Sequence, residues 1–240
     1  MALAWNSRTT MVLKLMKISN ITVVMRNHTV VLDILHFTRK TCMKVVQFLN
    51  LMVLNSKKKP NEGRMSNLAF AYDPDGYWIE IVAREKTTYS GFNFSQTMIR
   101  IKDPAKSLAF YRDLLGMEII KERHFEEAKF SLYFMASKRK NGEDEDKNPM
   151  TLFHPVLELT HNHGTENDEN FSYHNGNTDP KGFGHTGFLV DDLSKACEFL
   201  EDNKVQFKKK PEEGKMRGIA FVCDPDGYWV ELIQRGATFQ

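Results

Sequence analysis

The stretch DPDGYWIE at residues 73–80 returns as DPDGYWVE at residues 224–231 with a single conservative change. The repeat extends outward from this stretch, because residues 57–82 and 208–233 align at a constant offset of 151 with 16 identities in 26 positions. In each copy an apolar run, LAFAY or IAFVC, precedes the D-P-D-G turn, and residues of alternating character follow it. This pattern predicts a β-hairpin in both copies.

The second strand of the later hairpin sorts its side chains by alternation. Tyr228, Val230 and Leu232 fall on one face, and Trp229 and Glu231 fall on the other, because successive side chains of a strand point to opposite sides. Glu231 therefore points to the same side as Trp229.

The segments between the hairpins predict repeated units of strand and helix. SQTMIRIKD at 95–103 alternates like a strand, and PAKSLAFYRDLLGM at 104–117 begins with Pro, spaces its apolar residues helically and stops at Gly116. Further strands are expected at 128–136 and 156–162, separated by a charged loop.

The last third of the chain repeats this order. GHTGFLVDD at 184–192 predicts a strand, LSKACEFLEDNK at 193–204 predicts a helix, and the second hairpin follows. We therefore expect an α+β fold of repeated βαβββ modules. The expected domains are a partial or degenerate module at 1–90, a second module at 91–165 and a third at 166–240.

Composition sets limits on the function. The formal net charge of the 240-residue chain is +2, so no strong field favours nucleic acid or an anionic membrane as partner. The three cysteines, Cys42, Cys197 and Cys223, form no metal-type pair, and their odd number favours free thiols and a cytoplasmic protein. No apolar run approaches the roughly 20 residues of a membrane helix.

A single module carries only one helical layer over a small sheet, so modules must pair to bury their sheets. Two curved sheets joined side by side leave a cleft into which alternate strand positions point. The candidates at such positions are Gln96, Glu158, His185 and Glu231. Histidine and carboxylate side chains bind divalent metals, which predicts a mononuclear site.

Four separated motifs then carry a family resemblance. QTMIRIKDPAKSLAFYRDLLGM, LELTHN, SYHNGNTDPKGFGH and KKPEEGKMRGIAFVCDPDGYWVE, within about residues 94–234, resemble the glyoxalase I (lactoylglutathione lyase) family of the vicinal oxygen chelate fold. Residues 57–86 resemble the end of another copy of that family's second half. The resemblance implies a lyase that converts the glutathione–methylglyoxal hemithioacetal to S-lactoylglutathione and so detoxifies methylglyoxal.

The resemblance also implies roles for the cleft residues. Gln96, Glu158, His185 and Glu231 would be the four ligands of one divalent metal, with Zn²⁺ expected and Ni²⁺ possible, because an N/O donor set suits several ions. Glu231 would be the general base and Glu158 the second proton carrier. The reacting C–H is a very weak acid, so the chemistry needs both a Lewis acid and a positioned carboxylate.

Glutathione is an anionic tripeptide, which needs cations and amides around it. By resemblance, the substrate-binding residues would be Arg100, Asn162, Lys181, Lys209, Lys215, Met216 and Trp229. The family usually has Arg at the position of Lys181, and Lys keeps the charge but loses the planar fork of the guanidinium. Four apolar side chains are offered either as the lining for the aldehyde group or as plain core: Phe125, Phe130, Leu132 and Phe134.

Two questions stay open at the level of sequence. The family's site forms between unlike modules, so Gln96 and Glu158 could be completed by His185 and Glu231 of a partner chain in a homodimer. They could instead be completed within the chain by Glu80, with His28 as the counterpart of His185. A non-catalytic member of the fold that binds a small molecule at an incomplete site is the alternative function.

Overall fold

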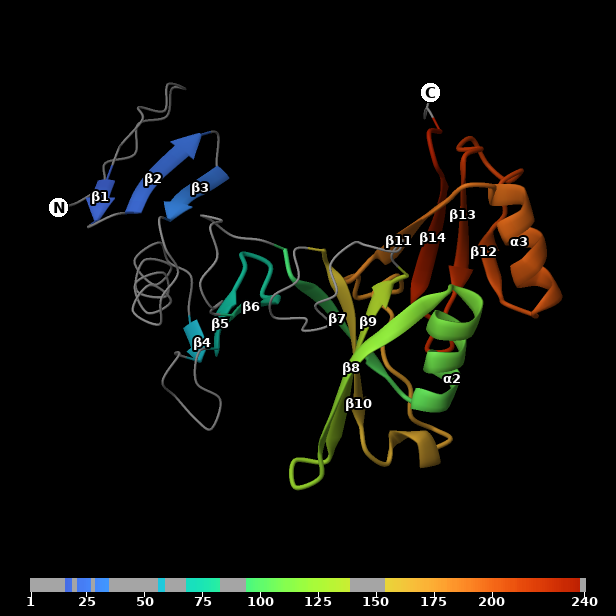
Figure 1. Ribbon diagram of the computed structural model, residues 1–240, viewed down its shortest axis with the longest axis horizontal. Coiled ribbons are helices and arrows are strands. Elements are labelled where there is room, and N and C mark those ends of the chain that lie inside the picture. Colours follow the sequence, from blue (N-terminus) through green and yellow to red (C-terminus); the bar gives the residue numbers. More distant parts are fainter. Residues whose placement is uncertain are drawn as a thin grey trace. The chain divides into compact units, whose positions relative to one another are not determined.

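The computed structural model describes residues 68–82, 94–138 and 154–237 in full, and four short strands nearer the N-terminus by their backbone (Figure 1). The chain divides into two compact units, Met1–Phe94 and Ser95–Gln240. His28 and Cys42 lie outside the described residues.

The first unit contains two three-stranded antiparallel sheets. One has the order β1-β2-β3 and the other the order β4-β5-β6. The strand bounds are β1 (Met16–Ile18), β2 (Ile21–Arg26), β3 (Thr29–Ile34), β4 (Ser56–Lys58), β5 (Leu68–Tyr72) and β6 (Trp78–Val82).

The second unit begins with a βαβββ module. Its sheet has the order β7-β10-β9-β8, with β7 and β10 parallel and the other pairs antiparallel. Asp103 caps the helical segment by accepting the backbone N–H of Ala105, and Pro104 occupies the first turn. The elements are β7 (Gln96–Ile101), α2 (Pro104–Leu108), the π-helical segment η1 (Ala109–Leu114), β8 (Met117–Phe125), β9 (Phe130–Ser137) and β10 (Val156–Asn162).

A second βαβββ module follows with the same topology. Its sheet has the order β11-β14-β13-β12, and β11 and β14 are parallel. Asp192 caps the helix by accepting the N–H of Lys195. The elements are β11 (His185–Val190), α3 (Leu193–Asp202), β12 (Phe207–Lys209), β13 (Ile219–Cys223) and β14 (Trp229–Gln234). The expected α+β class of repeated βαβββ modules is confirmed.

One apolar core joins the two modules of the second unit. It combines Leu157 and Leu159 of β10 and Tyr111 of η1 with Leu200 of α3 and Val230 of β14. In Figure 1 the two sheets extend in different directions from the helices α2 and α3. The faces that point away from this core are therefore the ones on which polar site residues can lie.

The sequence repeat is also a structural repeat. Strand β5 pairs with β6 in the register Leu68↔Val82 to Tyr72↔Trp78, and β13 pairs with β14 from Ile219↔Ile233 to Cys223↔Trp229, at the same offset of 151. Asp73 and Asp224 make the same turn, since each accepts two backbone N–H groups through Oδ1. Both predicted hairpins are confirmed.

The environments of the two hairpins differ. In the second, Tyr228 is 8% exposed and Val230 is fully buried, as the alternation predicts. In the first, Tyr77, Trp78 and Ile79 are 46–50% exposed. Identical turn chemistry thus folds both copies, while burial of the following strand depends on the module against which it packs.

The turn of the second hairpin clamps the two modules of the second unit together. Tyr111 donates its hydroxyl hydrogen to Asp224 Oδ2 at 2.8 Å. Asp226 accepts the backbone N–H of Lys102 at 2.9 Å and the hydroxyl of Ser107 at 3.3 Å. Burial raises the pKa of the Asp224 carboxyl from the usual 3.8 to about 6, and burial also raises the pKa of Tyr111 and of Asp226.

Two strands were not predicted. The helical segment ends at Leu114 with Leu115 as its C-cap and Gly116 at φ +72°, so the predicted stop at Gly116 is confirmed, but β8, which begins at Met117, was missed. Strand β12 was likewise missed. Cys197 and Cys223 are free, as the cysteine count predicts, and both are buried. Within the described residues no helix is long and apolar enough to span a membrane.

Candidate metal half-sites

Gln96 and Glu158 form the first polar pair of the second unit. They lie on the parallel strands β7 and β10, where Met98 is the direct partner of Glu158. Gln96 donates from Nε2 to Glu158 Oε2 at 2.6 Å, and Thr160 donates its hydroxyl to Oε1 at 3.3 Å. Glu158 is 8% exposed, so this carboxylate is buried with a hydrogen bond on each oxygen. The sheet fixes the backbone of both residues, because β10 is an internal strand and β7 is an edge strand that pairs with it in parallel.

His185 and Glu231 form the second pair, on the parallel strands β11 and β14. His185 Nε2 lies 3.2 Å from Glu231 Oε2, with 43% of the imidazole and 16% of the carboxylate side chain exposed. Gly187 is the direct partner of Glu231, and its missing side chain leaves space beside the carboxylate. The imidazole also packs edge-on against Phe221 at 5.2 Å.

The loop before β11 sets the position of His185. At Gly176, φ is +84°, and an added Cβ would lie 2.0 Å from the carbonyl oxygen of Phe183, so only glycine fits there. Asn177 donates its side-chain amide to the carbonyl of Gly184 at 2.6 Å, and Gly182 donates its N–H to Gly176. These contacts close the loop directly in front of His185.

The two pairs remain separate within the part of the chain that is described. No group of three or more His, Cys, Asp or Glu side chains there is close enough to hold a metal ion. Each module of residues 95–237 thus presents two of the four candidate ligands. A four-ligand site needs the two kinds of pair to be brought together by another module or another chain.

The first hairpin offers a second candidate carboxylate. Glu80 lies on β6 opposite Phe70, as Glu231 lies on β14 opposite Phe221. Trp78 packs edge-on against Phe70 at 5.8 Å, and Trp229 packs against Phe221 at 5.7 Å. The local geometry is therefore the same in both copies, and only Glu80 of the proposed intrachain pair lies within the described residues.

Several candidate substrate residues flank the first pair. Arg100 follows Gln96 and Met98 on the same face of β7, and its partner on β10 is Thr160. Asn162 lies on the same face of β10 and donates to the hydroxyl of Tyr173 at 2.9 Å. The register also places four apolar side chains on this face, at Phe125, Phe130, Leu132 and Phe134.

The remaining candidates lie on the second module. Lys209 Nζ donates to the backbone carbonyls of Lys210, Met216 and Ile219 at 2.8–3.0 Å, which uses all three hydrogens of its ammonium group. Lys209 therefore holds the loop that carries two exposed candidates, Lys215 and Met216. Lys181 is exposed and Trp229 is partly exposed.

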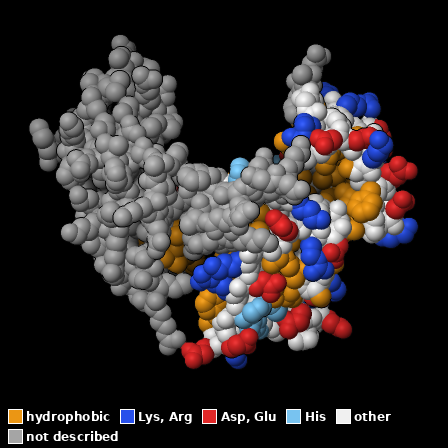
Figure 2. All heavy atoms as spheres, viewed as in Figure 1, with side chains coloured by type: hydrophobic (Ala, Val, Ile, Leu, Met, Phe, Trp, Pro, Cys, Tyr) orange, Lys and Arg blue, Asp and Glu red, His pale blue; other side chains and the backbone are white. Residues whose placement is uncertain are grey.

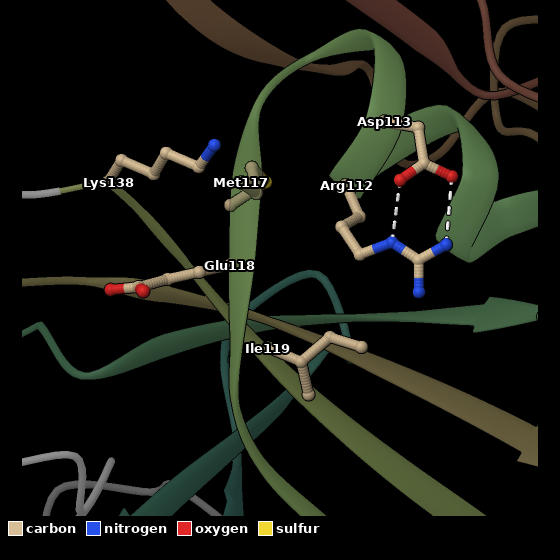
Figure 3. Close-up of a pocket in the computed structure, with 6 residues that line it drawn as sticks. All are labelled: Arg112, Asp113, Met117, Glu118, Ile119 and Lys138. Atoms are coloured by element: carbon tan, nitrogen blue, oxygen red, sulfur yellow. Dashed lines mark hydrogen bonds and ion pairs between the residues drawn. The ribbon is translucent and has the colours of Figure 1, made fainter.

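A surface hollow of about 630 Å³ lies elsewhere on this unit (Figure 3). Arg112 and Asp113 are paired at one side of it, at 2.7 and 2.8 Å, and Glu118 and Lys138 lie at the other side. Met117 and Ile119 complete the lining. None of the candidate ligands or substrate residues lines this hollow, so it is not the reaction site that the sequence predicts.

Sequence reasoning missed Thr160 and the pair Tyr111–Asp224. Thr160 has a signal that could have found it, because it lies two residues after Glu158 and thus on the same face of the strand. The contact between Tyr111 and Asp224 joins residues 113 positions apart and has no local signal.

Comparison with known proteins identifies the family. The model of the Glyoxalase/Bleomycin resistance protein/Dioxygenase superfamily matches residues 93–232, more than half of the chain. The chain belongs to this superfamily. The chain is similar to glyoxalase I of Saccharomyces cerevisiae, which is 43% identical over 206 residues, or 82% of this chain and 60% of that relative. Lactoylglutathione lyase of Pseudomonas putida is 48% identical over 158 residues, or 64% of this chain and 91% of that relative.

A solved structure of the same superfamily supports the fold. The crystal structure of glyoxalase I from Zea mays superposes with a TM-score of 0.61 at 26% identity, covering 80% of this chain and 63% of that one. The chain spans about 60% of the length of the yeast relative. The match covers 91% of the length of the Pseudomonas putida relative.

The four candidate ligands suit a divalent metal ion, which the resemblance to the glyoxalase I family implies. An amide oxygen, an imidazole nitrogen and two carboxylate oxygens form an N/O set without thiolate, which suits borderline and harder divalent ions. The hydrogen bond from Gln96 Nε2 to Glu158 turns the amide oxygen away from this carboxylate. Gln96, Glu158, His185 and Glu231 would hold the ion.

Proposed function

We propose that this chain is a lactoylglutathione lyase, which converts the hemithioacetal of glutathione and methylglyoxal to S-lactoylglutathione and thereby removes methylglyoxal. The observation that carries the proposal is the presence of two polar pairs, Gln96–Glu158 and His185–Glu231, each across two parallel strands of a βαβββ module. The names of relatives at 43% and 48% identity support the reaction class.

Burial separates the roles of the two carboxylates. Glu158 is buried and both of its oxygens accept hydrogen bonds, whereas Glu231 is more exposed and faces a half-exposed imidazole. A group that removes a proton from carbon must reach the substrate. We therefore assign the general base to Glu231, which takes the proton at Oε1 or Oε2, and the second proton position to Glu158.

A divalent ion held by the four ligands would supply Lewis-acid polarisation of the two adjacent substrate oxygens. The proposed ion is Zn²⁺, with Ni²⁺ as the alternative. The protein's own residues orient the substrate and exclude water, and the apolar face formed by Phe134, Leu132 and their neighbours would contact the methyl group of the aldehyde.

Positive side chains would hold the carboxylates of glutathione. Arg100 is the best placed of them, because it lies on the same face of β7 as Gln96 and is the strand partner of Thr160 on β10. Lys215 and Lys181 are exposed and can reach an anion, while Lys209 supports the loop through its carbonyl contacts. Asn162, Met216 and Trp229 would border the bound tripeptide.

The site would be assembled in a homodimer. Because the pairs of one chain do not converge within residues 95–237, a second copy can offer its His185 and Glu231 to Gln96 and Glu158 of the first, and the reverse. The competing arrangement uses Glu80 and His28 of the same chain. Free cysteines agree with a cytoplasmic location.

Metal removal tests the reaction and its metal dependence together. Purified protein should form thioester from methylglyoxal and glutathione, followed by ultraviolet absorbance. Dialysis against a chelator should reduce the rate by at least ~10²-fold. General-base catalysis alone typically contributes only about 10²–10⁴-fold, so the metal must supply much of the remaining acceleration. Reconstitution with Zn²⁺ and with Ni²⁺ in parallel identifies the better metal. Full turnover by rigorously stripped protein contradicts the proposal, and an absence of turnover in every metal form favours a non-catalytic binding protein.

A further inference from the structure

Two imidazoles converge on one hydroxyl in the sheet β7-β10-β9-β8. His124 on β8 is the strand partner of Ser131 on β9, and its Nδ1 lies 2.9 Å from Ser131 Oγ. His163, which follows β10, places its Nε2 2.8 Å from the same oxygen. Two ring nitrogens from separate segments thus point at one position.

A carboxylate lies behind each of these rings. Glu122 Oε2 is 3.5 Å from Nε2 of His124, and Glu126 Oε2 is 3.9 Å from Nδ1 of His163. Histidines that bind metals commonly direct their outer N–H to a carboxylate, which fixes the tautomer and makes the inner nitrogen a better ligand. Each ring therefore has a carboxylate on its outer side, which a small side-chain movement would bring to hydrogen-bond distance.

The hydrogens of the neutral cluster cannot satisfy every contact. Ser131 has one hydroxyl hydrogen, so it can donate to only one of the two inner nitrogens, and the other inner nitrogen must itself donate to Ser131. The outer nitrogen of that second ring then carries no hydrogen and faces a carboxylate oxygen. A cation between the rings removes the conflict, because both inner nitrogens become ligands and both outer nitrogens carry hydrogens.

We propose that His124 and His163 bind a divalent transition-metal ion of the Zn²⁺ class, with Ser131 Oγ beside it and water in the remaining positions. Imidazole nitrogen suits Zn²⁺, Ni²⁺ and Cu²⁺ better than Mg²⁺ or Ca²⁺. The rings must close on the ion to about 2.0–2.1 Å, the usual zinc–nitrogen distance. Side-chain exposures of 48% for His124 and 27% for His163 leave both rings open to solvent and able to turn.

This position is independent of the proposed lyase site. Ser131 pairs with His161 on β10, which lies three residues after Glu158 and therefore on the opposite face of the sheet. The ring of His161 is 5.5 Å from that of His163, but its Nε2 is 2.7 Å from Glu166. Figure 2 shows histidine side chains at the lower end of the described surface, next to acidic ones. The ion would tie β8 and β9 to the segment after β10.

The test is a count of bound zinc. The untagged full chain is stripped with chelator and dialysed against Zn²⁺ near neutral pH, where imidazole is largely unprotonated. His124→Gln and His163→Gln should each bind a single ion fewer per chain than the parent while keeping the parent's lyase rate. His154→Gln, a change at an exposed histidine, should leave the count unchanged.

A second variant separates metal binding from a purely structural hydrogen bond. Ser131→Ala removes the shared hydroxyl but keeps both imidazoles, so it should retain the ion. Equal zinc counts for the parent, His124→Gln and His163→Gln would overturn the proposal, and an extra proton would then resolve the conflict between the rings. Loss of the ion in Ser131→Ala together with its retention in both histidine variants would overturn it as well.

Discussion

Glu231→Gln should lower kcat/KM for the hemithioacetal by about 10²–10⁴-fold, because it replaces the proposed general base by a group of equal size that cannot accept a proton. Glu231 lies 3.2 Å from His185 and is partly exposed, so the substitution leaves the packing of β14 unchanged. The free energy of unfolding should change little, because the substitution keeps the size of a side chain that is only 16% exposed and leaves no cavity. Steady-state kinetics and urea denaturation measure both quantities.

Glu80→Gln is the matched control, since Glu80 occupies the same position of the same hairpin in the first copy. It should leave kcat/KM unchanged if the homodimer arrangement holds. A large loss with Glu80→Gln and a normal rate with Glu231→Gln would instead assign the base to the first hairpin and reject the inter-chain site.

Asp224→Ala should destabilise the second unit by about 3 kcal/mol, because it leaves the buried Tyr111 hydroxyl and two backbone N–H groups without their acceptor. Each unsatisfied buried group costs about 1–3 kcal/mol, and the loss of a partly unfavourable buried charge offsets part of the total. Equilibrium urea unfolding of the full chain measures the change.

Two controls separate the parts of this effect. Asp73→Ala removes the same turn contacts in the first hairpin, where Asp73 accepts N–H groups of Asp75 and Tyr77, and it should leave the second unit's transition unchanged. Asp224→Asn keeps an oxygen for the turn and should cost less than Asp224→Ala. An equal loss of stability in all three variants would contradict the clamp between the modules.

The same carboxyl makes stability depend on pH. Its pKa is about 6 in the folded protein against a usual 3.8, a difference that corresponds to about 3 kcal/mol. Between these two pH values the folded state therefore binds more protons than the unfolded state. The stabilisation that the protonated Asp224 carboxyl gives the folded state is complete below pH 3.8 and is lost as the pH rises through 6. Asp224→Asn should flatten this slope between pH 4 and pH 7 in the unfolding free energy, relative to the parent.

Local patterns predicted those parts of the fold that local chemistry determines. The D-P-D-G turns and the alternation after Asp224 correctly placed the buried Tyr228 and Val230. Strand β8 was missed because its sequence, MEIIKERHF, combines charged residues on an edge strand with a shifted register near Ile119, which breaks the alternation. The end of the helix was predicted correctly, because Gly116 takes the left-handed conformation that commonly follows the last helical residues.

The candidate site was predictable only in part. Resemblance provided its four ligands and their division between two unlike modules, and strand alternation placed Glu231 beside Trp229, but neither gave the contacts within each pair, such as the 2.6 Å bond from Gln96 to Glu158. Lys209 was assigned to substrate by its charge, and its use for three loop carbonyls depends on chain geometry that spacing does not encode. The contact of Tyr111 with Asp224 is likewise a product of tertiary packing.

The most direct test of the inter-chain site is complementation between two inactive variants. Glu158→Gln and Glu231→Gln chains, co-expressed with different affinity tags and purified through both tags, form mixed dimers. In each mixed dimer one site carries both substitutions and the other carries neither, so about half of the parent's specific activity should return. Mixed dimers as inactive as either variant alone would contradict the account.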